Sequence, residues 1–120
     1  SGKPGGGQFV GGSQAPARSF VKSHRLIVRS CAERDIAAAI GDYAAIATGL
    51  GAMFLVRTDA AMAAIQRVPE GCRKSHGEFR HLVLRRFPFG VFYLFDGETV
   101  SVVAVLNLRQ DPEAIRARLK

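Results

Sequence analysis

The stretch HLVLRRFPFGVFYLFDGETVSVVAVLNLRQDP, from His81 to Pro112, decides the fold of this chain. It holds three apolar runs rich in residues that favour β-strands, and a polar exit follows the last of them. Asp96-Gly97 separates the second run from the third. An Asp-Gly pair between apolar runs is a strong hairpin signal, because both turn residues adopt positive φ. The stretch therefore predicts three consecutive strands joined as a meander.

The strands of this meander are expected over residues 79–87, 89–95 and 99–106. The run 89–95 is nearly all apolar, which is typical of a central strand that is buried on both faces. Residues 70–77, just before the meander, are polar and predict a loop. After it, Asp111 followed by proline indicates the start of a short terminal helix over 114–120.

Upstream of the meander, the sequence predicts a short strand at 26–28 and two helices at 31–48 and 52–67. Ser30 opens a capping-box match at the start of the first helix, and Pro69 stops the second. The buried stripe of the second helix is expected to consist of Phe54, Ala61, Ile65 and Val68. Both helices are rich in alanine, which permits close approach, so a tight antiparallel hairpin is expected.

The predicted order is strand, helix, helix, three strands and a short helix. We therefore expect an α+β fold in which the helical hairpin packs on one face of a small, twisted, mostly antiparallel sheet. We expect residues 21–120 to form a single domain. Residues 1–20 have the Gly-, Ser- and Pro-rich composition of a flexible N-terminal arm or a tag-derived segment.

The charge balance favours an acidic partner. The formal net charge is +7 over 120 residues, which suits either nucleic acid or an acidic protein that neutralises this one. No apolar run reaches the roughly 20 residues that span a bilayer, so we expect a cytoplasmic protein with no membrane partner. The two cysteines and three histidines show no metal-ligand spacing, so neither a metal nor another cofactor is expected.

Basic residues crowd the loop before the meander, its first strand and its exit. The candidates for binding nucleic acid or a protein target are Arg73, Lys74, Arg80, Arg85, Arg86 and Arg109. The competing interpretation is a solvated edge strand whose charges discourage aggregation. A ribonuclease that uses no metal needs a proton carrier and cations for the phosphate, and His81, Arg85 and Arg109 are the candidates for these roles. Strand alternation places His81 and Arg85 on one face. For His81, a half-exposed strand histidine without a catalytic role is the competing interpretation.

From about residue 24 to its end, the chain resembles the RelE/ParE superfamily of type II toxin–antitoxin toxins. The resemblance rests on ERDIAAAIGDY in the first helix, VPEG after the second, RRFPFGVFYLFDGETVSVVAVL in the meander and NLRQDPEAIRARL at the end. The two long helices before the sheet are similar to the ParE branch rather than to RelE.

The resemblance implies a basic toxin held inactive by a cognate antitoxin, whose acidic, partly disordered C-terminal segment wraps over the sheet and helices. ParE-like members inhibit DNA gyrase, whereas RelE-like members cut mRNA on the ribosome. Where many RelE proteins carry a strand arginine this chain has Gly90, and where they often carry histidine it has Asn107, although Arg109 matches. These differences favour the gyrase inhibitor, which is not an enzyme.

Two alternatives stay open. The first is a RelE-like, ribosome-dependent and metal-independent endoribonuclease. The second is a degenerate, non-toxic protein that still binds an antitoxin. A homodimer and a toxin–antitoxin hetero-oligomer are both compatible with the sequence.

Overall fold

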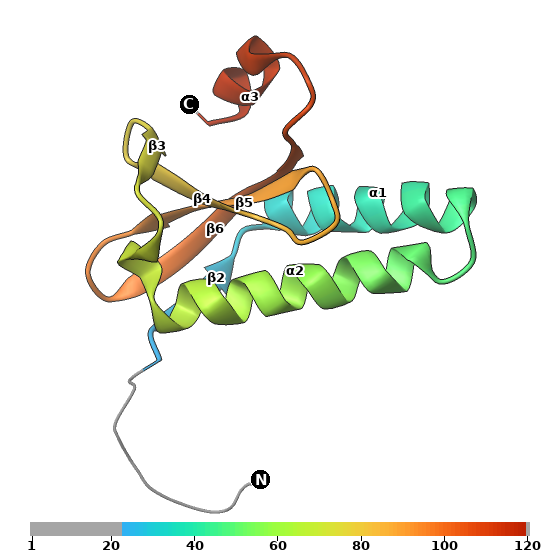
Figure 1. The fold of residues 1–120 in the computed structure, drawn as a ribbon. Helices are drawn as coiled ribbons and strands as arrows, with labels where there is room; N and C mark the ends of the chain where they lie inside the picture. Colours follow the sequence, from blue (N-terminus) through green and yellow to red (C-terminus); the bar gives the residue numbers. More distant parts are fainter. Residues whose placement is uncertain (1–22, 120) are drawn as a thin grey trace, which may run out of the picture.

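The computed structural model describes residues 23–119 and has the α+β architecture that the sequence predicts (Figure 1). The expected N-terminal arm at 1–20 lies outside the described residues. The helices are α1 (Ser30–Ile46), α2 (Leu50–Arg67), the short 3-10 turn η1 (Pro69–Gly71) and α3 (Pro112–Arg118). The strands are β2 (Arg25–Val28), β3 (Lys74–His76), β4 (Phe79–Val83), β5 (Phe89–Phe95) and β6 (Thr99–Asn107).

The strands form one sheet in the order β2-β6-β5-β4-β3. The predicted meander β4-β5-β6 is antiparallel, and β5 is the central strand, as expected from its apolar run. β2 pairs in parallel with β6, where Leu26 lies opposite Val100. The sheet is therefore mixed but mostly antiparallel.

Each face of the sheet has its own apolar cluster. Towards the hairpin, the cluster of buried side chains includes Phe54, Val91, Tyr93, Val100 and Val102. Towards α3, it consists of Phe92, Ala104, Leu106, Ile115 and Leu119. In Figure 1, α3 stands on the opposite side of the sheet from α2. The short terminal helix thus covers a face that the hairpin does not reach.

A bulge in β6 decides which of its residues face which cluster. Phe92 lies opposite Ala104, but the next residue of β5, Tyr93, lies opposite Val102, so Val103 is an extra residue on β6. An extra residue reverses the alternation of side chains along a strand. As a result, Val102 faces the hairpin whereas Ala104, two residues later, faces α3.

The helical hairpin is tight, as predicted. A Cβ atom built on Gly51 of α2 would lie 2.7 Å from the backbone oxygen of Ile40 in α1, so only glycine fits this crossing. Nearby, Tyr43 stacks on Phe54 with ring centroids 5.5 Å apart. This contact joins both helices to the aromatic residues that precede and begin β5.

The predicted caps and buried stripe need two corrections. Ser30 is the first helical residue of α1 rather than its cap; the N-cap is Arg29, which makes no side-chain capping bond. Val68 is 59% exposed and lies outside the core, because α2 ends at Arg67. The cap of α3 is confirmed, since Asp111 Oδ1 accepts a hydrogen bond of 3.0 Å from the Glu113 amide.

The strand boundaries differ from the prediction on both sides of β4. The predicted polar loop contains the three-residue strand β3, which pairs with β4. β4 ends at Val83 instead of residue 87, because Arg86 takes a left-handed conformation with φ of 70° in the following turn. The chain therefore reverses earlier than the apolar pattern suggests.

The Asp96-Gly97 hairpin is confirmed, but its turn differs from the expected one. Gly97 has positive φ and Asp96 does not. Asp96 Oδ1 instead accepts hydrogen bonds from the amides of Glu98 (2.9 Å) and Thr99 (2.8 Å). A short side chain that satisfies the turn amides in this way replaces the second left-handed residue.

Among residues 23–119, no helix is long and apolar enough to cross a bilayer.

Candidate docking site between helix α2 and strand β4

Five of the six predicted basic residues separate into two groups, and the sixth, Arg109, follows the end of β6. Arg73, Lys74 and Arg80 lie where β3 pairs with β4, with Lys74 opposite Arg80. Arg85 and Arg86 lie beyond the other end of β4, in an exposed turn. Arg80 lies near the start of β4 and Arg85 lies two residues past its end, so about 17 Å along the strand direction separates the groups. The basic residues therefore do not form one continuous patch.

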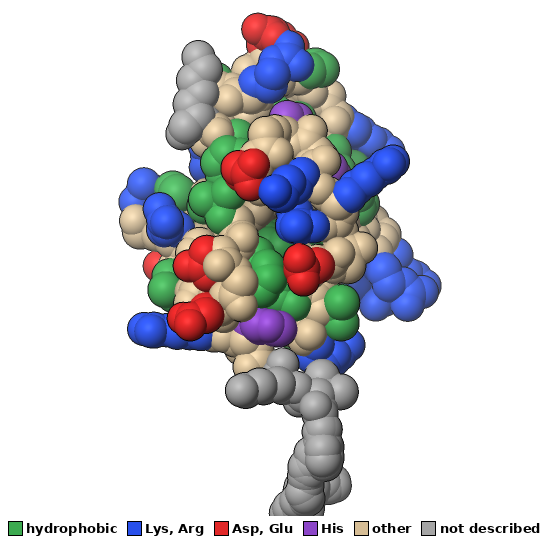
Figure 2. All heavy atoms as spheres, turned by 90° about the vertical axis from the view of Figure 1, so that its left-hand side faces the viewer, with side chains coloured by type: hydrophobic (Ala, Val, Ile, Leu, Met, Phe, Trp, Pro, Cys, Tyr) green, Lys and Arg blue, Asp and Glu red, His purple; other side chains and the backbone are tan. Residues whose placement is uncertain are grey.

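In the first group, part of the positive charge is already engaged. Lys74 Nζ lies 2.8 Å from a carboxylate oxygen of Glu78, and Arg80 Nη1 donates a hydrogen bond of 2.5 Å to the backbone oxygen of Cys72. Proximity to Lys74 lowers the pKa of Glu78, first through the hydrogen bond and then through charge. Figure 2 shows acidic and basic side chains interspersed on this end of the molecule.

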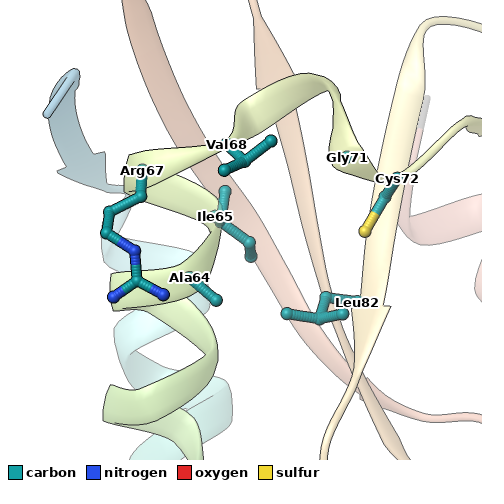
Figure 3. Close-up of a pocket in the computed structure, with 7 residues that line it drawn as sticks. All are labelled: Ala64, Ile65, Arg67, Val68, Gly71, Cys72 and Leu82. Atoms are coloured by element: carbon teal, nitrogen blue, oxygen red, sulfur yellow. The ribbon is translucent and has the colours of Figure 1, made fainter. Parts of the chain in front are cut away.

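Arg85, in the second group, borders a groove between α2 and β4. Two adjoining hollows of about 240 and 210 Å³ share Ala64 of α2 and Leu82 of β4. Figure 3 shows the first hollow, in which α2, the segment after η1 and β4 surround an apolar space. The second hollow extends toward the turn and is bounded by Arg57 and Arg85. We call the two hollows together the α2–β4 groove.

Arg57 is the functional candidate that the sequence analysis missed. Its Nε atom is buried and has no hydrogen-bond partner among the described residues. A buried donor without a partner costs about 1–3 kcal/mol, and a bound molecule could supply an acceptor only after the Arg57 side chain had moved to expose Nε. The signal was available: Arg57 lies three residues after Phe54 and four before Ala61, which is the spacing of the buried stripe.

Strand β4 also presents an open edge to the groove. β3 pairs with β4 only at Phe79 and Arg80. On the other side of β4, Leu84 donates its backbone N–H to the backbone oxygen of Phe89, the first residue of β5. Among the described residues, no strand covers the outer edge beyond His81, and Val83 is 51% exposed there. An unpaired edge beside an apolar groove can accept an additional strand or an extended segment.

His81 lies on the opposite face of the sheet from this groove. Its ring stacks on Phe92, which belongs to the cluster under α3, at a centroid distance of 4.8 Å. Its Nδ1 lies 2.8 Å from Ser75 Oγ, and the same oxygen lies 3.2 Å from His76 Nδ1. Burial, and then the nearby His76, lower the pKa of His81. At neutral pH the imidazole is therefore uncharged and can accept a proton.

His81 and Arg85 do not share a face, contrary to the prediction. Strand alternation would have aligned them, but β4 ends at Val83, and Arg85 turns toward α2 to line the groove. Arg109 follows the end of β6, where its amide donates a hydrogen bond of 2.9 Å to Asn107 Oδ1. The three residues considered for RNA cleavage thus come from separate structural settings, and their roles stay predictions.

The surroundings of Gly90 leave little space for a side chain. A Cβ atom there would lie 3.1 Å from the His81 ring and 3.2 Å from the Leu108 side chain. A long basic residue would require both of these side chains to shift.

Within residues 23–119, no group of three His, Cys, Asp or Glu side chains is positioned to hold a metal ion.

Comparison with known proteins gives a likeness of fold. No family model matches the chain, and no curated protein matches it. A chain of the solved structure described as "Chromosomal ParDE TA system from P. aeruginosa" superposes with a TM-score of 0.63 at 18% sequence identity. The match covers 72% of this chain and 98% of that chain. The predicted ParE-like fold is therefore confirmed.

Proposed function

We propose that this protein is the toxin of a type II toxin–antitoxin pair, of the ParE-like branch, and that it acts by inhibiting DNA gyrase. The observation that carries the proposal is the likeness in fold to a chain of a ParDE system, which extends over 98% of that chain. The net charge of +7 supports an acidic antitoxin as the neutralising partner.

The α2–β4 groove is the proposed binding site of the antitoxin segment. Its apolar lining suits large apolar side chains, and Arg57 and Arg85 at its border suit carboxylates. The open edge of β4 offers backbone groups to an extended chain. A partly disordered acidic segment that orders on binding would satisfy all three features.

Two matched valines test this site. Val83 lies on the open edge of β4 that borders the groove, whereas Val56 lies on α2 outside the groove, and both are more than half exposed. Asp at position 83 places a negative charge on this edge, where it repels an acidic partner. We expect Val83→Asp to weaken binding of the protein encoded beside this one at least tenfold, equivalent to about 1.4 kcal/mol, as measured by calorimetry. The variant Val56→Asp should bind as the parent does, and the reverse ranking would refute the site.

Gyrase rather than RNA is the proposed target because of two positions in the sheet. Glycine at position 90 leaves the strand arginine of RelE-like proteins without an equivalent here, and the side chains of His81 and Leu108 pack closely beside it. Asn107 has no titratable proton at neutral pH, and its Oδ1 atom already accepts a hydrogen bond from the Arg109 amide. Supercoiling of relaxed plasmid by purified gyrase should fall as the chain is added. Unchanged supercoiling at a large molar excess would rule out this target.

RNA cleavage is the second candidate, and one observation favours it. The uncharged His81 imidazole lies beside the Ser75 hydroxyl and is available as a base. Primer extension on translated mRNA, after expression of the chain, separates the two targets. Codon-positioned cuts that disappear in His81→Gln and in Arg109→Ala would establish the ribonuclease, whereas uncut mRNA would support the gyrase inhibitor.

A further inference from the structure

A serine between two histidines lies on the face of the sheet that carries α3. Ser75 Oγ is 2.8 Å from His81 Nδ1 and 3.2 Å from His76 Nδ1. The proposed gyrase inhibitor makes no use of this cluster. The ribonuclease alternative uses the His81 ring as a base toward RNA and assigns nothing to the serine hydroxyl.

A bulge in β3 brings these side chains together. Lys74 lies opposite Arg80 and His76 lies opposite Phe79, so Ser75 is an extra residue with no partner of its own on β4. Consecutive side chains of a regular strand point to opposite faces, and an extra residue interrupts that alternation. Ser75 and His76 therefore both face α3, although they are neighbours in sequence, and both line one hollow there.

Phe92 supports both histidine rings. Its own side chain is fully buried. The His81 ring stacks on it with a centroid distance of 4.8 Å, and the His76 ring meets its edge at 5.7 Å. Packing of this kind restricts the rotamers of the two histidines, so the hydroxyl of Ser75 meets ring nitrogens that are held in position.

One hydroxyl proton is shared between two ring nitrogens. A serine hydroxyl donates one hydrogen bond and accepts others. The shorter contact assigns the Ser75 proton to His81 Nδ1, and His76 then donates its Nδ1 proton to the serine oxygen. Burial, and then the nearby His76, lower the pKa of His81, which keeps its ring free to accept a proton at neutral pH. This is the arrangement of a serine nucleophile and its general base.

The hydroxyl opens on a hollow of about 530 Å³ between the β3–β4 turn and α3. In Figure 1, this turn and α3 stand on the same side of the sheet. The hollow is lined by Ser75, His76, Gly77, Phe79, Arg116 and Leu119. His81 is not among these lining residues, so the base lies behind the serine as seen from the hollow. Arg116 pairs with Glu113 at an exposed position, where an ion pair is weak enough to exchange for another partner.

We propose that Ser75 is a nucleophile with His81 as its general base, and that the hollow takes a small carboxylic ester with a short apolar acyl group. Oγ of Ser75 bonds to the carbonyl carbon while its proton passes to His81 Nδ1, and Arg116 stabilises the negative charge on the carbonyl oxygen. The ester C–O bond then breaks, and His81 returns the proton to the leaving alcohol. Water hydrolyses the acylated serine to release the carboxylic acid and restore the hydroxyl.

The lining of the hollow favours an uncharged ester over a phosphate diester. Phe79 and Leu119 provide apolar walls for the acyl group. Arg116 is the one cationic side chain among the lining residues, whereas phosphoryl transfer relies on several cations or metal ions around the phosphate. The activity is therefore separate from cleavage of RNA.

The probe for this activity is p-nitrophenyl acetate, added to the purified full chain. We expect a burst of about one equivalent of p-nitrophenolate per chain, followed by slow turnover, and peptide mass spectrometry should place the acetyl group on Ser75. Ser75→Ala should abolish the burst, and His81→Gln should slow it at least tenfold, because glutamine cannot take up the proton. Circular dichroism checks that both variants fold.

Ser101→Ala is the matched control. Ser101 lies opposite Leu94 on the same sheet and lines a separate hollow, whose lining residues include no histidine. This variant should keep the burst of the parent chain. An acetyl group found only on histidine or lysine, a burst that survives in Ser75→Ala, an unchanged rate in His81→Gln, or no acetylation of the parent chain would each overturn the proposal. None of these results depends on toxicity or on antitoxin binding.

Discussion

At the scale of single residues, Asp35 is the contact that joins three elements. Its carboxylate projects from α1 and accepts a hydrogen bond of 3.1 Å from the Val105 amide of β6. It also accepts two hydrogen bonds, of 2.7 and 3.0 Å, from the Arg118 guanidinium of α3. β2 pairs with β6 only as far as Val102, so Asp35 satisfies a strand edge that no strand covers among the described residues. It substitutes for a neighbouring strand.

Removal of Asp35 should therefore cost more than removal of its ionic partner. Asp35→Ala leaves the Val105 amide without an acceptor and should lower the free energy of unfolding by about 2–3 kcal/mol. Arg118→Ala leaves that hydrogen bond intact and removes only the ion pair, in which the side chain of Arg118 is 40% exposed and that of Asp35 is 15% exposed, so about 1 kcal/mol is expected. Urea denaturation of both variants measures the difference. Equal losses would show that the amide contact contributes nothing.

His81 should make the stability depend on pH. Burial and then His76 hold its pKa below the ordinary value of 6.5, so the unfolded chain takes up the proton more readily than the folded one. The folded state is then destabilised as the pH falls below about 6.5 and is unaffected by this group well above it. Urea midpoints between pH 5 and 8 should fall on the acid side in the parent and fall less in His81→Gln. Identical pH profiles would contradict the assignment.

At the scale of helices and strands, the hairpin crossing offers a matched pair of glycines. Gly51 lies against the backbone of α1, whereas a Cβ on Gly41, within α1, would meet nothing within 4 Å. Gly51→Ala should therefore lower the free energy of unfolding by about 1–3 kcal/mol, through forced separation of the helices. Gly41→Ala should raise it by about 0.5–1 kcal/mol, the gain in helix propensity. Thermal unfolding gives the sign of each change, and a stabilised Gly51→Ala would disprove the tight crossing.

The sequence predicts these elements well where local chemistry decides them, and less well where distant contacts do. The helices follow from apolar spacing, and the α3 start follows from Asp111. β3 is polar throughout and exists because β4 pairs with it, so its own residues gave no signal. The early end of β4 depends on the left-handed Arg86, a conformation that arginine rarely takes. The extra residue at Val103 is likewise fixed by pairing with β5, not by its neighbours in sequence.

At the scale of the whole molecule, the fold could be predicted more fully than the site. The order of elements and the strand pattern specify a hairpin on a sheet, and the ParE-like fold is confirmed. The site depends on how α2 and β4 meet, which no local pattern contains. Arg57 and Arg85 are 28 positions apart in sequence and border one groove, whereas His81, four positions from Arg85, lies on the other face of the sheet.

Growth after induced expression of the chain tests the central claim most directly, with and without the protein encoded beside it. The account predicts arrest by the chain alone and recovery when its neighbour is co-expressed. It also predicts that Val83→Asp, which changes the edge of β4 beside the α2–β4 groove, still arrests growth, and that co-expression of the neighbour no longer restores it. Normal growth of cells that have accumulated the folded chain would contradict the account.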